Sequence, residues 1–291
     1  MNVIDTSGHI PEAFEEGRFR LPKWEKYMDA HVPGAKDVCL ADLAESIRKG
    51  CSWENDVLPV LDAAAADPER LEKAARSFRK VTEGLDERIL KAFGRTVDAD
   101  VVLYLGLCNG AGWATEVRGR RTLLLGVEKI LELDWCGEDA MNGLVLHETG
   151  HVYHEQYGAA EPAGLPTPDR FLWQLFSEGV AMVFEQEALG DPGYFHQDRD
   201  EWKDRCEANE GRILRSFAED LPAMTPATQR YFGDRVRFMG MPDTGYYLGA
   251  KFVRHLMRDG GFDAVIRYGT REIREGFARY AREAGAEGTK A

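Results

Sequence analysis

The stretch MNGLVLHETGHVYHEQYG, Met141–Gly158, places two histidines and a glutamate in the middle of an otherwise apolar run. The histidines, His147 and His151, are four residues apart. On an α-helix this spacing puts their side chains one turn apart and about 40° apart around the axis. Both imidazoles can therefore reach one metal ion at the usual zinc–nitrogen distance of about 2.0–2.1 Å. Apolar residues on the other faces predict that the helix is buried: Val145, Leu146, Val152 and Tyr153.

Glu148 directly follows the first histidine, and this position suits a base better than a ligand. A carboxylate there can hold and deprotonate a metal-bound water, which is the chemistry of the His-Glu-x-x-His pattern. Buried imidazole or charge without a partner is costly, so a metal ion would account for these polar residues. The alternative is a surface helix whose polar residues meet by chance.

A catalytic zinc ion usually has three protein ligands and one open position, so a third ligand is needed. His154 and Glu155 lie further along the same helix, which is poor geometry for one tetrahedral ion. We expect them at the rim of a cleft, or as a satisfied polar pair. Glu178, in LWQLFSEGVAMVFE, is the better candidate because a carboxylate in so apolar a helix favours a cation as partner. Gly179 beside it permits close approach of another helix. The alternative is that Glu178 faces solvent.

The set His147-Glu148-x-x-His151 followed by Glu178-Gly179-x-Ala181 resembles the gluzincin metallopeptidases, the broad group of thermolysin and the M1-type aminopeptidases. It is similar to bacterial families of predicted zinc-dependent proteases with a strand pair, HExxH and a downstream Glu-Gly-x-Ala. The resemblance covers about residues 97–260. It implies one zinc ion per chain, bound by His147, His151 and Glu178, with Glu148 as the general base.

The sequence departs from the thermolysin-like pattern in two respects. There are 26 residues between His151 and Glu178, more than usual, and a Gly/Pro-rich loop at 158–168 can absorb the excess at little cost. Thermolysin-like enzymes also place an Asp four residues after the ligand Glu to orient a histidine, and this chain has Met182 there. Another group would then be needed, and Glu185 or Glu155 are the candidates.

The resemblance also implies a Tyr or His from the C-terminal part as a donor to the oxyanion of the reaction. DTGYYLGAKF offers Tyr246, which we favour as this second catalytic residue, and Tyr247 as a substrate-binding residue. The alternative is that both tyrosines are core aromatics. His196, in a loop, is a weaker candidate for the oxyanion donor.

An extended peptide substrate would pair with an edge strand, for which NGAGWATEVRG is the candidate. Within it we expect Gly112, Trp113 and Ala114 to bind substrate, with Gly110 and Gly112 allowing close approach. A glycine-rich lead into a hairpin, without a role in binding, is the alternative.

The alternation of patterns predicts an α+β fold with a small antiparallel or mixed sheet and a mainly helical C-terminal subdomain. The resemblance implies that this fold is zincin-like, with an active-site helix after the sheet. We expect an N-terminal helical region at 1–95 and a zincin-like metallopeptidase domain at 96–291. Within that domain we expect strands at 97–130, the active-site helix at 138–157 and a helical lobe at 166–291.

Helix signals refine this expectation. Asp67 followed by Pro68 predicts the start of a helix that continues to about Gly94, and Thr167 and Thr244 are expected as caps of later helices. The hairpin turn is expected at Gly119-Arg120. Further helices are expected at about 198–218, 244–259 and 270–284.

The overall composition argues against several other classes of protein and site. The 291 residues carry a net charge of −13, which disfavours a nucleic-acid partner or attraction to anionic lipid. Five cysteines without a CxxC pair argue against a disulfide framework and a cysteine zinc site: Cys39, Cys51, Cys108, Cys136 and Cys206. We see no signal peptide and no membrane-spanning run, so the expected location is the cytoplasm.

The leading hypothesis is therefore a cytoplasmic zinc metallopeptidase that acts on peptides. Two others stay open. One is a zinc hydrolase of another amide or an ester. The other is a metal-binding regulatory module without turnover. The sequence does not separate endopeptidase from exopeptidase action, and it leaves the oligomeric state open.

Overall fold

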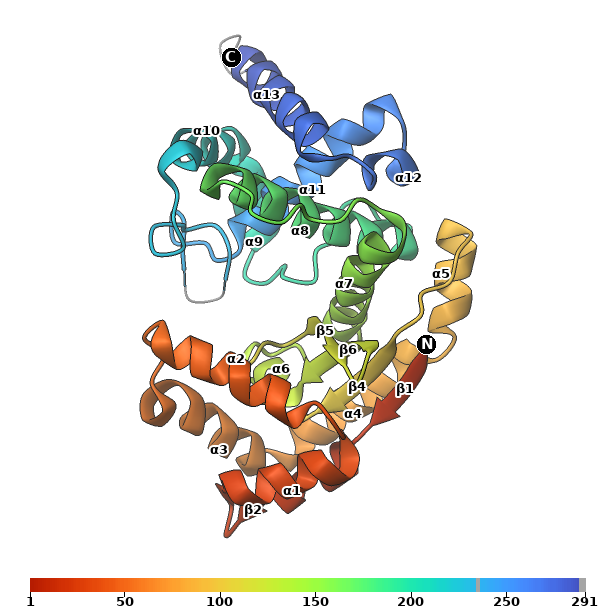
Figure 1. The fold of residues 1–291 in the computed structure, drawn as a ribbon, viewed down its shortest axis with the longest axis vertical. Helices are drawn as coiled ribbons and strands as arrows, with labels where there is room; N and C mark the ends of the chain where they lie inside the picture. Colours follow the sequence, from red (N-terminus) through yellow and green to blue (C-terminus); the bar gives the residue numbers. More distant parts are fainter. Residues whose placement is uncertain (234–235, 288–291) are drawn as a thin grey trace. The chain divides into compact units, whose positions relative to one another are not determined.

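A computed structural model describes residues 1–233 and 236–287, and it is α+β (Figure 1). The chain forms two compact units, Met1–Val152 and Tyr153–Ala291, described separately below. Helix α7 (Glu138–Tyr157) begins in the first unit and ends in the second. The two units divide the chain inside this helix, whereas the sequence suggested a division at residues 95 and 96.

The first unit contains a four-stranded mixed sheet in the order β1-β4-β6-β5. Its strands are β1 (Asn2–Asp5), β4 (Asp100–Tyr104), β5 (Trp113–Val117) and β6 (Arg120–Gly126). Strands β1, β4 and β6 are parallel, and β5 pairs antiparallel with β6 at one edge. The branched residues of β4 and β6 are buried on both faces, as is typical of central parallel strands. The strands predicted at 97–130 are thus confirmed as far as Gly126, whereas residues 127–130 are helical.

The N-terminal region is mainly helical, as expected, but it also contributes three short strands. Strand β1 adds to the sheet beside β4, and β2 (Phe14–Glu15) pairs with β3 (Arg18–Phe19) in a small second sheet. These strands have two to four residues, too few to show a period of two in the sequence. They are strands because they hydrogen-bond to neighbouring strands, and their own residue pattern does not indicate it.

The β5–β6 hairpin turns one residue earlier than predicted. Its central residues are Arg118 and Gly119, with φ of 52° and 76°, and Val117 pairs with Arg120. Two left-handed residues match the right-handed twist of the strands, which is the reason for Gly119.

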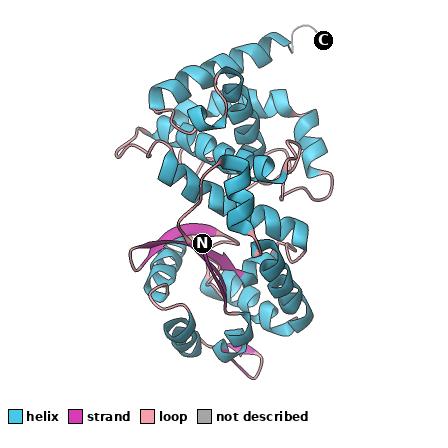
Figure 2. Cartoon of the chain, turned by 90° about the vertical axis from the view of Figure 1, so that its right-hand side faces the viewer, coloured by secondary structure: helices cyan, strands magenta, loops and turns pink. Residues whose placement is uncertain are grey.

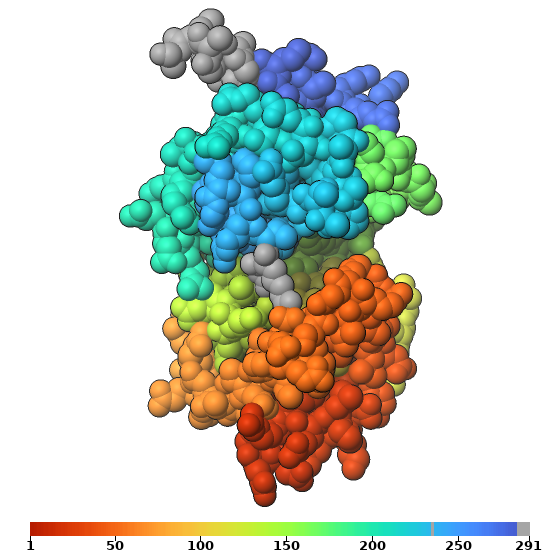
Figure 3. Space-filling view, turned by 90° about the vertical axis from the view of Figure 1, so that its left-hand side faces the viewer, coloured from red at the N-terminus to blue at the C-terminus, as the bar shows by residue number. Residues whose placement is uncertain are grey.

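Helices fill the rest of the first unit, and residues 1–66, red to orange, form much of its surface in Figure 3. They are η1 (Ser7–Ala13), α1 (Leu21–His31), α2 (Lys36–Arg48), η2 (Trp53–Val57), α3 (Leu58–Ala66), α4 (Pro68–Thr82), α5 (Leu85–Phe93) and α6 (Val127–Glu132). The cap at Asp67 is confirmed, since its carboxylate accepts a hydrogen bond from Arg70 N at 3.0 Å. The single helix predicted from Pro68 to Gly94 is wrong, because left-handed Gly84 (φ 65°) separates α4 from α5.

Helix α7 has the bounds predicted from the sequence. Its C-terminal end is closed at Gly158, whose N–H donates to His154 O at 2.8 Å. Val145, Leu146 and Val152 are fully buried, so the apolar faces lie in the core as expected.

The second unit is helical. Its elements are α8 (Thr167–Leu189), α9 (Trp202–Ala208), α10 (Glu210–Asp220), η3 (Leu221–Ala223), α11 (Thr244–Leu256), η4 (Met257–Asp259), α12 (Phe262–Val265) and α13 (Thr270–Glu287). The predicted caps Thr167 and Thr244 are wrong: both are first helical residues, after Pro166 and Asp243. The helix expected at 198–218 is broken at Asn209 into α9 and α10.

Figure 2 colours the helices cyan and the strands magenta. In the described part of the chain, every strand lies before residue 127. Within that part, no helix combines the length and apolar character that crossing a bilayer requires.

Candidate functional site

The two histidines of α7 converge. His147 Nε2 and His151 Nε2 lie 3.2 Å apart, and their rings are nearly perpendicular, at 87°. Two nitrogens bound to one tetrahedral zinc at about 2.0–2.1 Å would be roughly 3.4 Å apart. The helix therefore holds the pair within a few tenths of an ångström of the separation needed for chelation. His147 is buried and His151 is half-buried, so one side of the pair is accessible.

Glu148 is also buried, and the backbone of Gly112 lies directly against its side chain. A Cβ added at Gly112 would be 2.7 Å from Glu148 Cγ and 2.9 Å from Glu148 Oε1. It would also be 2.9 Å from Leu144 Cδ1. Only glycine fits here without displacing the carboxylate. The residue that leads into strand β5 is thus in contact with the expected general base.

Strand β5 has the features expected of a strand that binds an extended peptide. It is at the edge of the sheet, with Trp113 opposite Leu124 and Ala114 opposite Leu123 on its one described neighbour, β6. Trp113 and Ala114 are half-buried, and Trp113 Nε1 donates to Tyr104 Oη at 3.2 Å. The backbone of an edge strand can hydrogen-bond to an added strand.

A buried carboxylate that the sequence analysis missed, Glu128 of α6, holds the loop between β4 and β5. Its oxygens accept hydrogen bonds from Gly106 N at 2.8 Å and Cys108 N at 3.0 Å. Burial raises the pKa of Glu128 to about 7, although these backbone hydrogen bonds act in the opposite direction. The loop that carries Gly110 and Gly112 is therefore tied to the interior of the first unit.

Glu178 lies on α8 in the second unit and is half-buried. The close helix approach predicted at Gly179 is confirmed: a Cβ there would overlap the carbonyl oxygen of Gly249 on α11. A Cβ at Gly249 would in turn be 2.6 Å from Leu175 O. This crossing fixes the part of α8 that carries Glu178 through direct backbone packing.

Glu185 and His196 form a buried pair in the second unit. Glu185 Oε2 and His196 Nδ1 are 2.8 Å apart, and both side chains are almost fully buried. The sequence suggests separate roles for the two residues, Glu185 to orient a histidine and His196 as a weaker oxyanion donor, and does not indicate that they pair. Met182, where an Asp would stand in thermolysin-like enzymes, is buried one turn before Glu185.

The two tyrosines of α11 differ. Tyr247 is fully buried against Phe195 and Trp202, and its hydroxyl donates to Glu210 at 2.8 Å. This placement matches the core-aromatic alternative and contradicts a role in substrate binding. Tyr246, in the first turn, is half-buried with its ring against Phe232. It stays a candidate for the oxyanion donor.

His154 is a buried core residue whose polar partner is a backbone carbonyl, and not a residue at the rim of a cleft. Its Nε2 lies 3.1 Å from Ile266 O, and its ring is stacked on Trp173 and meets Phe176 edge-on. Glu155 is exposed on the same helix.

Comparison with known proteins adds nothing to the site: no family model matches the chain, and neither a curated protein nor a solved structure matches it. The function must therefore be argued from the geometry of the site.

Proposed function

We propose that this protein is a zinc-dependent hydrolase of peptide bonds. The observation that carries the proposal is the arrangement in the first unit. Two imidazole nitrogens lie 3.2 Å apart, and Glu148 beside them lies against Gly112, the residue that leads into the edge strand β5. Metal ligands, a base and a surface for an extended chain are the parts that such hydrolysis requires.

Zinc, when bound, would polarise the scissile carbonyl and lower the pKa of a water molecule. Glu148 would take a proton from that water and deliver it to the leaving amine. Strand β5 would hold the substrate backbone, and Gly112 would keep it close to the carboxylate. Tyr246 would donate a hydrogen bond to the developing oxyanion.

Glu178 is the proposed third ligand. The last turn of α7 belongs to the second unit and packs there on α8, with Tyr153 against Phe184 and His154 against Phe176. Glu178 lies between those two phenylalanines in the sequence of α8. The histidine pair precedes the same turn on one continuous helix. Carboxylate with two imidazoles is a common donor set of catalytic zinc.

The test combines metal content with turnover. Protein purified without chelator should contain about one zinc held by His147 and His151, and Glu148→Gln should keep the metal but lose at least about 100-fold in kcat on a peptide library. Glu87→Gln, an exposed helical glutamate of the same unit, is the charge-matched control. Equal turnover of wild type and Glu148→Gln would contradict the proposal.

Two alternatives are outcomes of the same experiment. A hydrolase of another amide or ester would show Glu148-dependent turnover only on non-peptide substrates. A regulatory metal-binding module would keep zinc and show no turnover that depends on Glu148.

A further inference from the structure

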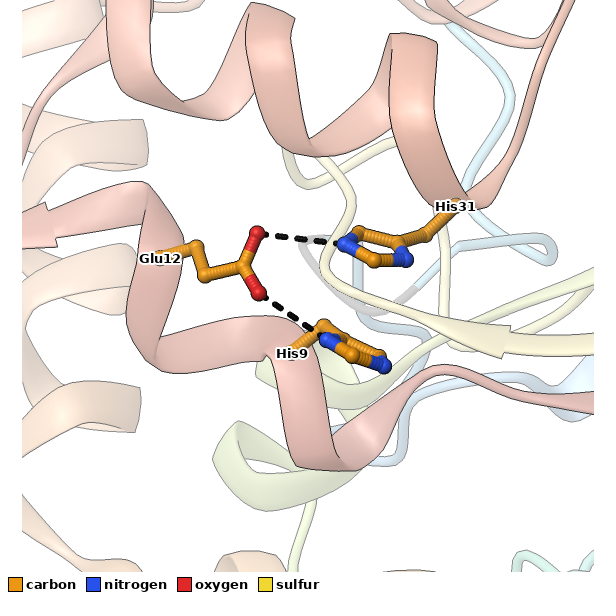
Figure 4. A group of neighbouring side chains, drawn as sticks. All are labelled: His9, Glu12 and His31. Carbon is orange, nitrogen blue, oxygen red and sulfur yellow. Dashed lines mark hydrogen bonds and ion pairs between the residues drawn. The ribbon is translucent and has the colours of Figure 1, made fainter.

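Three metal-ligating side chains meet on the surface of the first unit, away from α7 in the sequence. Glu12 Oε1 lies 2.9 Å from His9 Nδ1, and Glu12 Oε2 lies 3.1 Å from His31 Nε2 (Figure 4). The donor atoms of the three residues all lie within 4.8 Å of one another. The two rings are stacked, with centroids 3.8 Å apart and planes inclined by 15°, so both nitrogens face the same carboxylate.

We propose that His9, Glu12 and His31 form a binding site for one divalent transition-metal ion, such as Zn²⁺, Ni²⁺ or Cu²⁺, independent of the proposed catalytic zinc. Two imidazoles and a carboxylate suit these ions, whereas Mg²⁺ and Ca²⁺ prefer oxygen ligands throughout. In a tetrahedral zinc site the donors would be roughly 3.4 Å apart. The two histidine–carboxylate distances are already close to that value.

The donors are held by elements that are themselves fixed. His9 and Glu12 belong to η1, where Ile10 and Ala13 are buried. His31 is the last residue of α1, whose Trp24, Tyr27 and Met28 are fully buried. The His31 ring also packs on Tyr27, with centroids 5.6 Å apart. Little ordering is then needed for binding, since only the exposed ends of the side chains have to adjust.

The arrangement of the donor atoms also favours a cation. The Glu12 carboxylate lies against both imidazoles, with one oxygen 2.9 Å from His9 Nδ1 and the other 3.1 Å from His31 Nε2. Metal binding would displace any proton held on the two ring nitrogens that face this carboxylate. The side chains are 51%, 54% and 22% exposed for His9, Glu12 and His31, so the ion keeps positions open to water and can exchange. Binding would tie η1 to the end of α1.

The experiment uses the chain with His147→Ala and His151→Ala, which removes the proposed catalytic pair and keeps the surface site. After chelator treatment, calorimetric titration with ZnCl₂ should show about one ion bound per chain, and zinc should raise the Tm. Adding His9→Ala and His31→Ala should abolish both effects. Glu12→Gln should weaken zinc binding at least about tenfold. Loss of a residue that only hydrogen-bonds to a metal ligand already costs about tenfold in affinity, and Glu12 is itself a proposed ligand. Glu15→Gln, an exposed neighbour, is the control and should change neither.

A titration that finds no zinc bound, or the same affinity after His9→Ala and His31→Ala, would overturn the proposal. If the His147 and His151 variant does not fold, the wild type and the His9→Ala/His31→Ala variant are compared for zinc content at saturating metal. The expected difference is one ion per chain, and no difference overturns the proposal. Peptide hydrolysis should survive in the His9→Ala/His31→Ala variant, so this site and the proposed catalytic site can fail separately.

Discussion

Glu178 and Glu185 are seven residues apart on α8, and therefore on nearly the same face of the helix. Their surroundings differ: Glu178 is half-buried, whereas Glu185 is fully buried and paired with His196. A ligand needs access to its metal, and a residue that orients a ligand or a donor does not. We therefore propose Glu178 as the ligand and the Glu185–His196 pair as support.

This difference predicts unequal losses of zinc affinity. Glu178→Gln should lower the affinity by more than about 100-fold, because a ligand is lost, and Glu185→Gln by about 10–100-fold. Competition with a fluorescent zinc chelator measures both, and Glu187→Gln, more exposed on the same helix, should leave affinity unchanged. A larger loss in Glu185→Gln than in Glu178→Gln would reverse the assignment.

At the scale of elements, the features that depend on local sequence could be predicted. Helix α7 and strands β5 and β6 have long or strongly patterned stretches, and their existence followed from period and turn signals. The convergence of His147 and His151 belongs to the same class, because one helix sets it. Strand β1 and the pairing of Glu185 with His196 could not be predicted, since each depends on a partner distant in sequence.

The helix crossing at Gly179 and Gly249 offers a test at this scale. Gly179→Ala should destabilise the protein by about 1–3 kcal/mol, because the added methyl group meets the backbone of α11, which cannot move aside as a side chain can. Gly190→Ala, at a left-handed cap with open space around it, is a strain control and should cost about 1 kcal/mol. Urea unfolding at constant pH measures both. A cost below about 1 kcal/mol for Gly179→Ala would contradict backbone contact at the crossing.

At the scale of the whole molecule, stability should depend on pH through Glu128. Its folded pKa of about 7 lies above the usual value near 4.5, so the folded state retains a proton that the unfolded state releases. The contribution is complete below about pH 4.5 and is lost as pH rises through about 7, a change of about 3 kcal/mol. The sequence does not mark this residue, because Glu128 lies at the end of the stretch expected to be strands, and its burial depends on the tertiary fold.

Glu128→Gln should remove that part of the pH dependence. Relative to wild type, the variant should gain about 3 kcal/mol between pH 4.5 and pH 8 in urea unfolding. Glu87→Gln, exposed in the same unit, should keep the wild-type slope. A slope unchanged in Glu128→Gln would show that the carboxyl does not titrate in this range.

The contact between Gly112 and Glu148 also constrains how the chain can diverge. Any side chain at position 112 would displace Glu148 Cγ, and position 148 is itself fixed between two histidines on one helix. Substitutions at the two positions are therefore not independent. Among descendants that keep the histidine pair, the glycine and the glutamate should persist together. In lineages that lose the Glu148 carboxylate, residues other than glycine should become possible at position 112.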